Sequence, residues 1–118
     1  MSTRTNATES VVRKHLDAFV TQKGIAAILA DYDEDARLHS EARVYRGKDE
    51  IRGFFVDFIA SLPAGAADRF SLRSFRVDGN LAYITWTTGD DIPLGTDTFV
   101  VERGKIVSQT FAMYARLP

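Results

Sequence analysis

The chain has 118 residues, enough for one domain with a modest core. Its 15 Lys and Arg side chains nearly balance its 16 Asp and Glu side chains, so no overall charge favours nucleic acid or an anionic membrane surface as a partner. Cysteine is absent, which excludes disulfides, thiolate nucleophiles and Cys-ligated zinc. The N-terminal residues lack the apolar core of a signal peptide, and no run of about 18 apolar residues occurs. We therefore expect a cytoplasmic protein that does not span a membrane.

Apolar spacing predicts three helices in the N-terminal half. Residues 8–23 carry apolar side chains at helical intervals, after a flexible tail over residues 1–7. Asn6 is the expected N-cap and Gly24 the expected stop. A second, short helix follows at Ile25–Leu29. The third is the most regular, with apolar residues at i, i+3, i+4, i+7, i+8 and i+11: Ile51, Phe54, Phe55, Phe58, Ile59 and Leu62.

The remainder of the chain is predicted to form sheet. Residues 36–45 have no helical period and are expected to form a strand with a turn. One hairpin turns at Asp78–Gly79–Asn80, since a DG pair between β-rich runs is a strong turn signal. A second turns at Arg103–Gly104–Lys105. Helices followed by antiparallel strands predict an α+β domain over residues 8–118 and argue against a doubly wound parallel sheet.

Three segments in this order resemble the nuclear transport factor 2-like superfamily, which includes ketosteroid isomerases, polyketide cyclases and SnoaL-like domains. They are ADYDEDA at residues 30–36, YRGKDEIRGFF at residues 45–55 and GKIV at residues 104–107. The resemblance implies a cone-shaped, curved antiparallel sheet of about four long strands and one or two short ones, closed by three N-terminal helices. It also implies a pocket on the concave face and a homodimer through the outer face. One fold hosts many chemistries, so function has to come from the site.

Alternation along the strands sorts side chains between the two faces of the sheet. The inward set is Ala82, Ile84, Trp86, Asp97, Phe99, Val101, Gln109, Phe111 and Met113. The outward set is rich in threonine and tyrosine: Tyr83, Thr85, Thr87, Thr96, Thr98, Thr110 and Tyr114. Such an outer face is either plain solvent surface or the dimer interface that the resemblance implies.

The resemblance also implies an oxyanion hole and a carboxylate base. Asp97 falls at the position of the oxyanion-hole aspartate, and His15 falls at or beside that of its tyrosine partner. An inward aspartate needs hydrogen bonds, a partner charge or a proton, unless it lies at the strand's start and reaches solvent. His15 is either an acid–base group or a boundary residue of its helix. The base position holds Ser40, or His39 if the gap shifts by one residue, and a serine hydroxyl cannot act as a base.

We predict His15 and Asp97 as the catalytic pair of a cofactor-free site without metal. The predicted substrate contacts are Phe19, Tyr32, Ser40, Trp86, Phe99, Gln109, Phe111 and Met113. Aromatic side chains at such positions are first of all core residues, and for Tyr32 core packing is an equal alternative. The acidic run Asp31–Asp35 is expected to be a solvated face rather than a cation site, because it lacks the pattern of a calcium loop. The functional hypothesis is proton transfer on a small apolar carbonyl compound. The alternative is a non-catalytic ligand-binding or dimerisation module.

Overall fold

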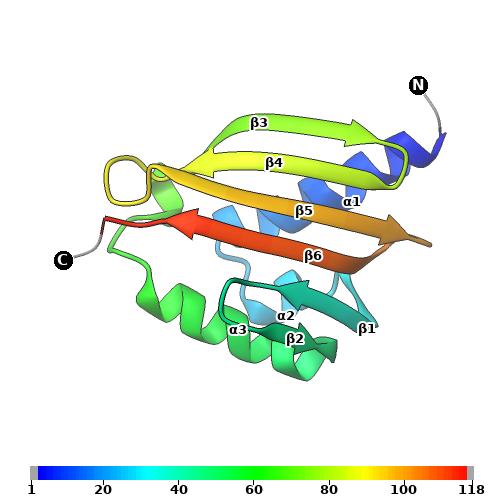
Figure 1. Cartoon of the computed structure of the whole chain (residues 1–118), viewed down its shortest axis with the longest axis horizontal. Coiled ribbons are helices and arrows are strands. Elements are labelled where there is room, and N and C mark those ends of the chain that lie inside the picture. The colour runs from blue at the N-terminus through cyan, green and yellow to red at the C-terminus, as the bar shows by residue number, and fades with distance from the viewer. Residues whose placement is uncertain (1–2, 117–118) are drawn as a thin grey trace.

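Three helices form in the regions that the apolar spacing predicts, although the first runs over Thr3–Val20 instead of residues 8–23. The computed structural model describes residues 3–116 and packs helices α1 (Thr3–Val20), α2 (Ile25–Leu29) and α3 (Gly47–Ser61) against one sheet (Figure 1). A single 3-10 turn, η1 (Ala67–Arg69), links α3 to the strands that follow. Within residues 3–116, no helix is both long enough and apolar enough to cross a membrane.

The sheet has six strands in the order β2-β1-β6-β5-β4-β3 and is curved and open. Their bounds are β1 Tyr32–His39, β2 Val44–Arg46, β3 Ser71–Asp78, β4 Leu81–Thr87, β5 Leu94–Glu102 and β6 Lys105–Tyr114. All neighbours pair antiparallel except β1 and β6, which run parallel. The expected α+β fold is confirmed, and both predicted hairpins are present. The hairpin signals cover β3 with β4 and β5 with β6, and they did not predict the parallel pairing of β1 with β6.

Helix α1 begins at Thr3, so the expectation of a flexible tail over residues 1–7 is wrong for residues 3–7, while Met1 and Ser2 lie outside the described residues. The early start has a physical cause in the β3–β4 turn. The Thr8 hydroxyl donates to the Gly79 carbonyl at 2.8 Å, and the Gly79 amide donates to the Thr5 hydroxyl at 2.9 Å. Asn6 therefore lies inside the helix instead of capping it.

The concave face of the sheet carries the core. Helix α1 crosses β3, β4 and β5, whereas α3 packs on β1 and β2. The inward set predicted from alternation is buried or half-buried throughout, and its members on β4 and β5 are all buried. On β1, Ala36 and Leu38 are buried and His39 is exposed, which fixes the register that the sequence left open.

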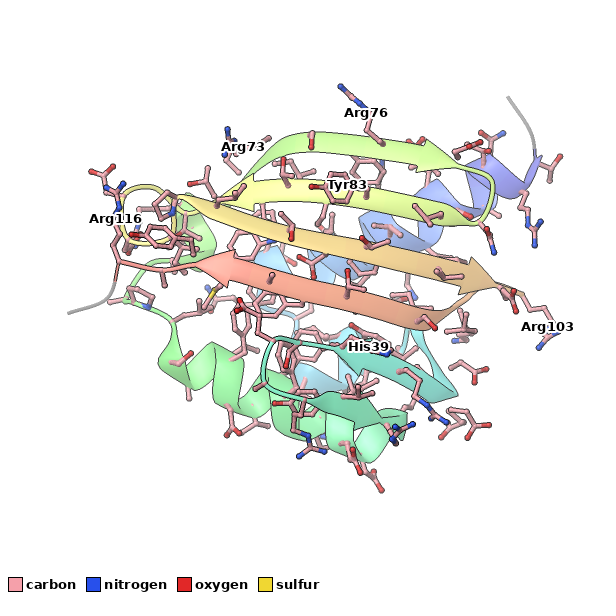
Figure 2. All side chains as sticks on the ribbon, in the orientation of Figure 1. His39, Arg73, Arg76, Tyr83, Arg103 and Arg116 are labelled. Carbon is pink, nitrogen blue, oxygen red and sulfur yellow. The ribbon has the colours of Figure 1, made fainter. Side chains whose placement is uncertain are left out.

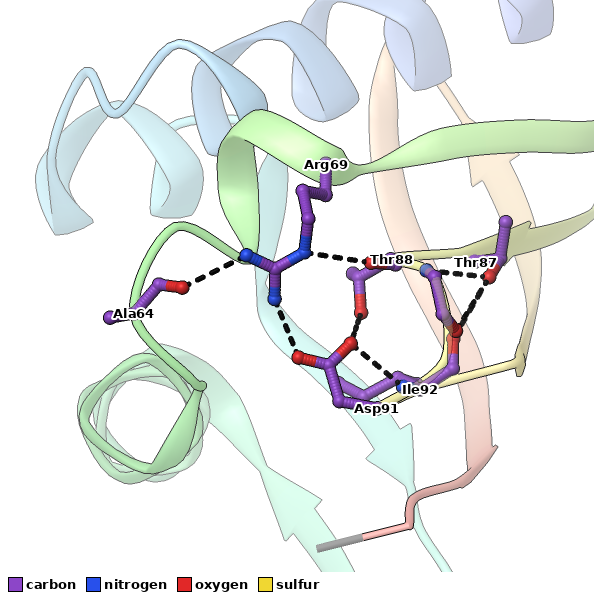
Figure 3. Close-up of polar contacts among 7 residues, drawn as sticks. Ala64, Arg69, Thr87, Thr88, Asp91 and Ile92 are labelled. Atoms are coloured by element: carbon purple, nitrogen blue, oxygen red, sulfur yellow. Dashed lines mark hydrogen bonds and ion pairs between the residues drawn. The ribbon is translucent and has the colours of Figure 1, made fainter.

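Arg69 ties the segment after α3 to the loop between β4 and β5 (Figure 3). Its guanidinium donates to the carbonyls of Ala64 at 2.9 Å and Thr88 at 3.1 Å, and it pairs with the Asp91 carboxylate at 2.5 Å. The three nitrogens of a guanidinium donate to three separate acceptors here, whereas a lysine offers its N–H donors from a single nitrogen. This clamp fixes the loops at one end of the concave face.

Candidate active site

A small cavity lies between the helices and the concave face of the sheet, with a volume of about 40 Å³. Its wall is mostly aromatic and comes from α1, α3 and strands β4 to β6; the lining residues are His15, Leu16, Phe19, Phe54, Phe55, Phe58, Phe70, Ile84, Trp86, Asp97, Phe99, Gln109 and Phe111. We call this space the inner cavity. Seven of these residues were predicted site residues: His15, Phe19, Trp86, Asp97, Phe99, Gln109 and Phe111.

A continuous chain of buried hydrogen bonds runs along one side of the inner cavity. Asp97 accepts from the Trp86 indole N–H at 2.8 Å and from the Gln109 amide at 2.8 Å. The Gln109 carbonyl oxygen in turn accepts from the Tyr32 hydroxyl. Because that hydroxyl has one proton, the contact of 3.3 Å between Tyr32 Oη and His15 Nε2 is satisfied when the imidazole donates. The chain therefore links His15 to Asp97 through Tyr32 and Gln109.

Strand register explains how distant residues meet in this chain. Gln109 on β6 lies opposite Phe99 on β5, and Asp97 lies two residues before Phe99 on the same face. Tyr32 opens β1, the parallel neighbour of β6. Trp86 lies opposite Gly95, where an added Cβ would overlap the indole ring. Only a glycine at position 95 leaves Trp86 in place beside Asp97.

Burial controls the ionisation of Asp97 and Tyr32, the two acidic groups in this chain of hydrogen bonds. Loss of hydration raises the pKa of Asp97 to about 7, even though its two hydrogen bonds favour the charged form. Burial, together with the carboxylates of Asp97 and Asp31, raises the pKa of Tyr32 well above its ordinary value. Tyr32 is therefore a permanent hydrogen-bond donor, whereas Asp97 exchanges its proton near neutral pH.

Asp31 is buried behind His15, and the expectation that the whole acidic run is a solvated face is wrong at this position. Its carboxylate accepts from Lys14 Nζ at 2.9 Å, and its second oxygen lies 3.7 Å from His15 Nδ1, which is an ion-pair separation and too long for a hydrogen bond. Burial would raise the pKa of Asp31, but His15 and Lys14 hold it below its ordinary value. Both ring nitrogens of His15 therefore face oxygen atoms.

Four predicted or alternative site residues do not line the inner cavity: Tyr32, Ser40, Met113 and His39. Ser40 lies in the β1–β2 turn, where its hydroxyl accepts from the amides of Ala42 and Arg43. Met113 is half-buried against the core, beyond the cavity wall. His39 is exposed on the outer face (Figure 2). Tyr32, also a predicted contact, lies behind the wall and reaches the cavity through Gln109.

A family comparison agrees with this arrangement. The model of the SnoaL-like domain matches residues 12–109, a span that holds the second half of α1, all elements from α2 to β5, the first half of β6 and both His15 and Asp97. The chain belongs to the SnoaL-like domain family. A search among curated proteins returned no match. Membership places the cavity in a known fold but leaves its chemistry open.

Solved structures show the same fold at low sequence identity. An NTF2-like protein of unknown function from Mesorhizobium loti is 22% identical, with 98% of this chain and 97% of that chain covered and a TM-score of 0.77. A Kribbella flavida protein assigned provisionally as a ketosteroid isomerase is 19% identical, with 97% and 82% covered and a TM-score of 0.70. A Sinorhizobium meliloti protein assigned provisionally as a polyketide cyclase is 18% identical, with 87% and 94% covered and a TM-score of 0.71. At these identities the likeness establishes the fold alone.

The site of this SnoaL-like domain offers one carboxyl group and one imidazole against aromatic walls. Within residues 3–116, no three His, Asp or Glu side chains gather in an arrangement that could hold a metal ion. Sequence reasoning missed Asp31, whose only signal was the adjacent basic pair Lys14 and His15 on the edge of the first helix. The chemistry that the geometry allows is hydrogen bonding or proton exchange between Asp97 and a small uncharged molecule.

Proposed function

We propose that the inner cavity binds the oxygen of a small, apolar carbonyl compound and that neutral Asp97 donates the hydrogen bond to it. One observation carries this proposal. Among the hydrogen bonds of the described residues, Asp97 only accepts, from Trp86 and Gln109, so the proton of its neutral form has no protein acceptor. A carbonyl oxygen in the cavity would supply one, and the aromatic wall would pack against the carbon atoms next to that oxygen.

The catalytic form of the proposal is proton transfer next to the carbonyl group. Asp97 gives its proton to the carbonyl oxygen while a proton on the neighbouring carbon passes to water, which yields the enol and the ionised carboxylate. Return of one proton to carbon and one to Asp97 completes an exchange or an isomerisation. A pKa of about 7 suits this role, because general acids work best near the ambient pH. His15 is a positioning residue, which acts on Asp97 through Tyr32 and Gln109.

A non-catalytic ligand-binding module is the second candidate. Ser40, at the position where the family resemblance implies a base, binds its own turn instead of facing the cavity. Of the described residues that line the inner cavity, His15 and Asp97 alone are ionisable, and His15 is held between Tyr32 and Asp31. Binding without turnover needs no further group.

Two measurements on ring ketones separate these candidates. Cyclohexanone and 2-cyclohexen-1-one are titrated from pH 5 to 9 against the fluorescence of Trp86, the single tryptophan, and their α-protons are followed by NMR in heavy water. We expect binding that weakens as Asp97 ionises above about pH 7. Asp97→Asn keeps a donor but cannot ionise, so its binding should not depend on pH and it should not exchange protons.

The control is Asp78→Asn at the exposed end of β3, which should behave like the wild type. Ketone binding with faster α-proton exchange supports the enzyme, and binding without it supports the binding module. Failure of both ketones to bind at pH 5 contradicts the proposal in either form.

We also propose that the outer face of the sheet pairs two copies of the chain. Tyr83 is 41% exposed and lies on this face (Figure 2), and the centre of the face is uncharged, with Thr98 directly opposite Thr110. An uncharged patch of this kind can meet the same patch on a second copy, as a symmetric dimer requires. Light scattering should give twice the monomer mass for the wild type and the monomer mass for Tyr83→Glu. The monomer mass for the wild type at about 100 micromolar protein contradicts the dimer, because the dissociation constant would then lie toward the millimolar range of weak binding.

A further inference from the structure

A second, larger apolar space lies outside the inner cavity. It is lined by the end of α1, by α2, by the last turns of α3 and by residues 63–67, and has a volume of about 510 Å³. We call it the outer groove. Its size falls within the range of ~300–1,000 Å³ that is usual for small-molecule sites. Among the described residues that line it, Gln22 carries the only polar side chain.

Phe19 is the wall between the two spaces, because it lines both of them. Its ring lies 5.9 Å from that of Phe58 and 6.1 Å from that of Phe70, both on the inner side. It belongs to the last turn of α1, immediately before a turn in which Gln22 has a φ of 55° and Gly24 a φ of 100°. Of the described lining residues, Phe19 alone is shared by Asp97's cavity and the outer groove.

The inner cavity is too small to hold an organic ligand by itself. At about 40 Å³ it has room for roughly three water molecules, taking ~15 Å³ for each. A ring ketone whose oxygen reaches Asp97 must displace Phe19 or extend past it. The space beyond Phe19 is the outer groove, so a ligand that enters the first space also meets the second.

The lining of the outer groove indicates the chemistry of what it holds. Val56 is 49% exposed and Ile59 is 40% exposed, one helical turn apart on α3, and they face the groove together with Ile25, Ile28 and Leu62. No charged side chain is present among the described lining residues, so a charged group would find no partner there. Aliphatic walls of this kind favour a neutral aliphatic chain.

We infer that the ligand is an amphipathic carbonyl compound, with its oxygen at Asp97 and an uncharged aliphatic tail in the outer groove past Phe19. This inference rests on the proposed function and adds a second subsite to it. The proposed function and the tail subsite can be tested separately. The tail contributes to affinity through buried apolar area, whereas the carbonyl head contributes through a hydrogen bond that depends on pH.

The test uses 4-alkylcyclohexanones with chains from none to eight carbons, titrated at pH 5 against Trp86 fluorescence. We expect the dissociation constant to fall by up to about fourfold for each methylene that enters the groove, which corresponds to ~0.8 kcal/mol per buried methylene. Ile59→Ser and Val56→Ser should flatten this dependence, so that they weaken the binding of the long-chain ketones far more than that of cyclohexanone. The control is Leu81→Ser, which is similarly exposed at 43% but lies on the outer face of the sheet. Circular dichroism confirms that each variant is folded.

Each outcome decides one of the two claims. If cyclohexanone binds with the expected pH dependence but chain length has no effect, the tail subsite is wrong and the proposed function stands. If longer chains bind tighter but equally so in Ile59→Ser, the tail lies elsewhere and the inference is again wrong. If Ile59→Ser changes the molecular mass in light scattering, the groove is an interface between copies. If no member of the series binds, the proposed function fails and the tail subsite fails with it.

Discussion

Replacing Asp97 with asparagine should remove a pH dependence of stability that is confined to the interval between about pH 4 and about pH 7. The pKa of Asp97 is 3.8 in an ordinary environment and about 7 in the folded chain. Between these values the folded state binds one more proton than the unfolded state, so the free energy of unfolding falls as pH rises. At ~1.36 kcal/mol per pH unit, the difference of about three units corresponds to a loss of roughly 4 kcal/mol.

The assay is urea unfolding of the wild type and Asp97→Asn at half-unit steps from pH 4 to pH 8. The difference between the two free energies should change by several kcal/mol across this range and become constant above about pH 7. Asp31 acts in the opposite sense, because its lowered pKa gives stability that is lost only as pH falls below its ordinary value of 3.8. It therefore leaves the measured window unaffected. A constant difference from pH 4 to pH 8 refutes a buried Asp97 with a raised pKa.

Three further substitutions test the structure around the site. Gly95→Ala should cost ~1–3 kcal/mol in urea unfolding and shift Trp86 emission, because the new methyl group overlaps the indole ring; Gly53→Ala, with open space around it, should cost nothing. Tyr32→Phe should cost ~1–3 kcal/mol in the same assay, since it leaves Gln109 and His15 without their shared partner, and an unchanged stability would contradict the chain of hydrogen bonds. Arg69→Lys should lower the melting temperature by an amount equivalent to ~1 kcal/mol because lysine cannot reach Ala64, Thr88 and Asp91 together, whereas Arg73→Lys on the outer sheet should not.

Strand alternation predicted the concave face well because a two-residue period leaves little freedom once one face is buried. The inward positions of Trp86, Asp97 and Gln109 follow from it, and they are three of the groups in the buried chain. Whether Asp97 reaches solvent at the start of its strand was open in the sequence. In the structure β5 begins earlier, at Leu94, so Asp97 is enclosed.

Contacts between distant residues were beyond the reach of periodicity. Tyr32 and Gln109 meet only because β1 and β6 are parallel neighbours, and no local signal predicts that pairing. Asp31 was hidden in a run of acids whose other members are half-buried or exposed, and its burial depends on Lys14 and His15 of α1. The outer groove likewise arises from the packing of three helices, although Ile59 was correctly placed on the apolar side of its helix.

The central claim is that Asp97 carries a proton near neutral pH and offers it to a carbonyl ligand. The most direct measurement is the carboxyl ¹³C chemical shift of labelled Asp97, titrated from pH 4 to pH 9 with and without cyclohexanone. We predict a midpoint near pH 7 in the free protein, and a higher midpoint with the ketone bound, because the ketone accepts a hydrogen bond only from the neutral acid. A midpoint near the ordinary value of 3.8, or one that the ketone does not move, contradicts the claim.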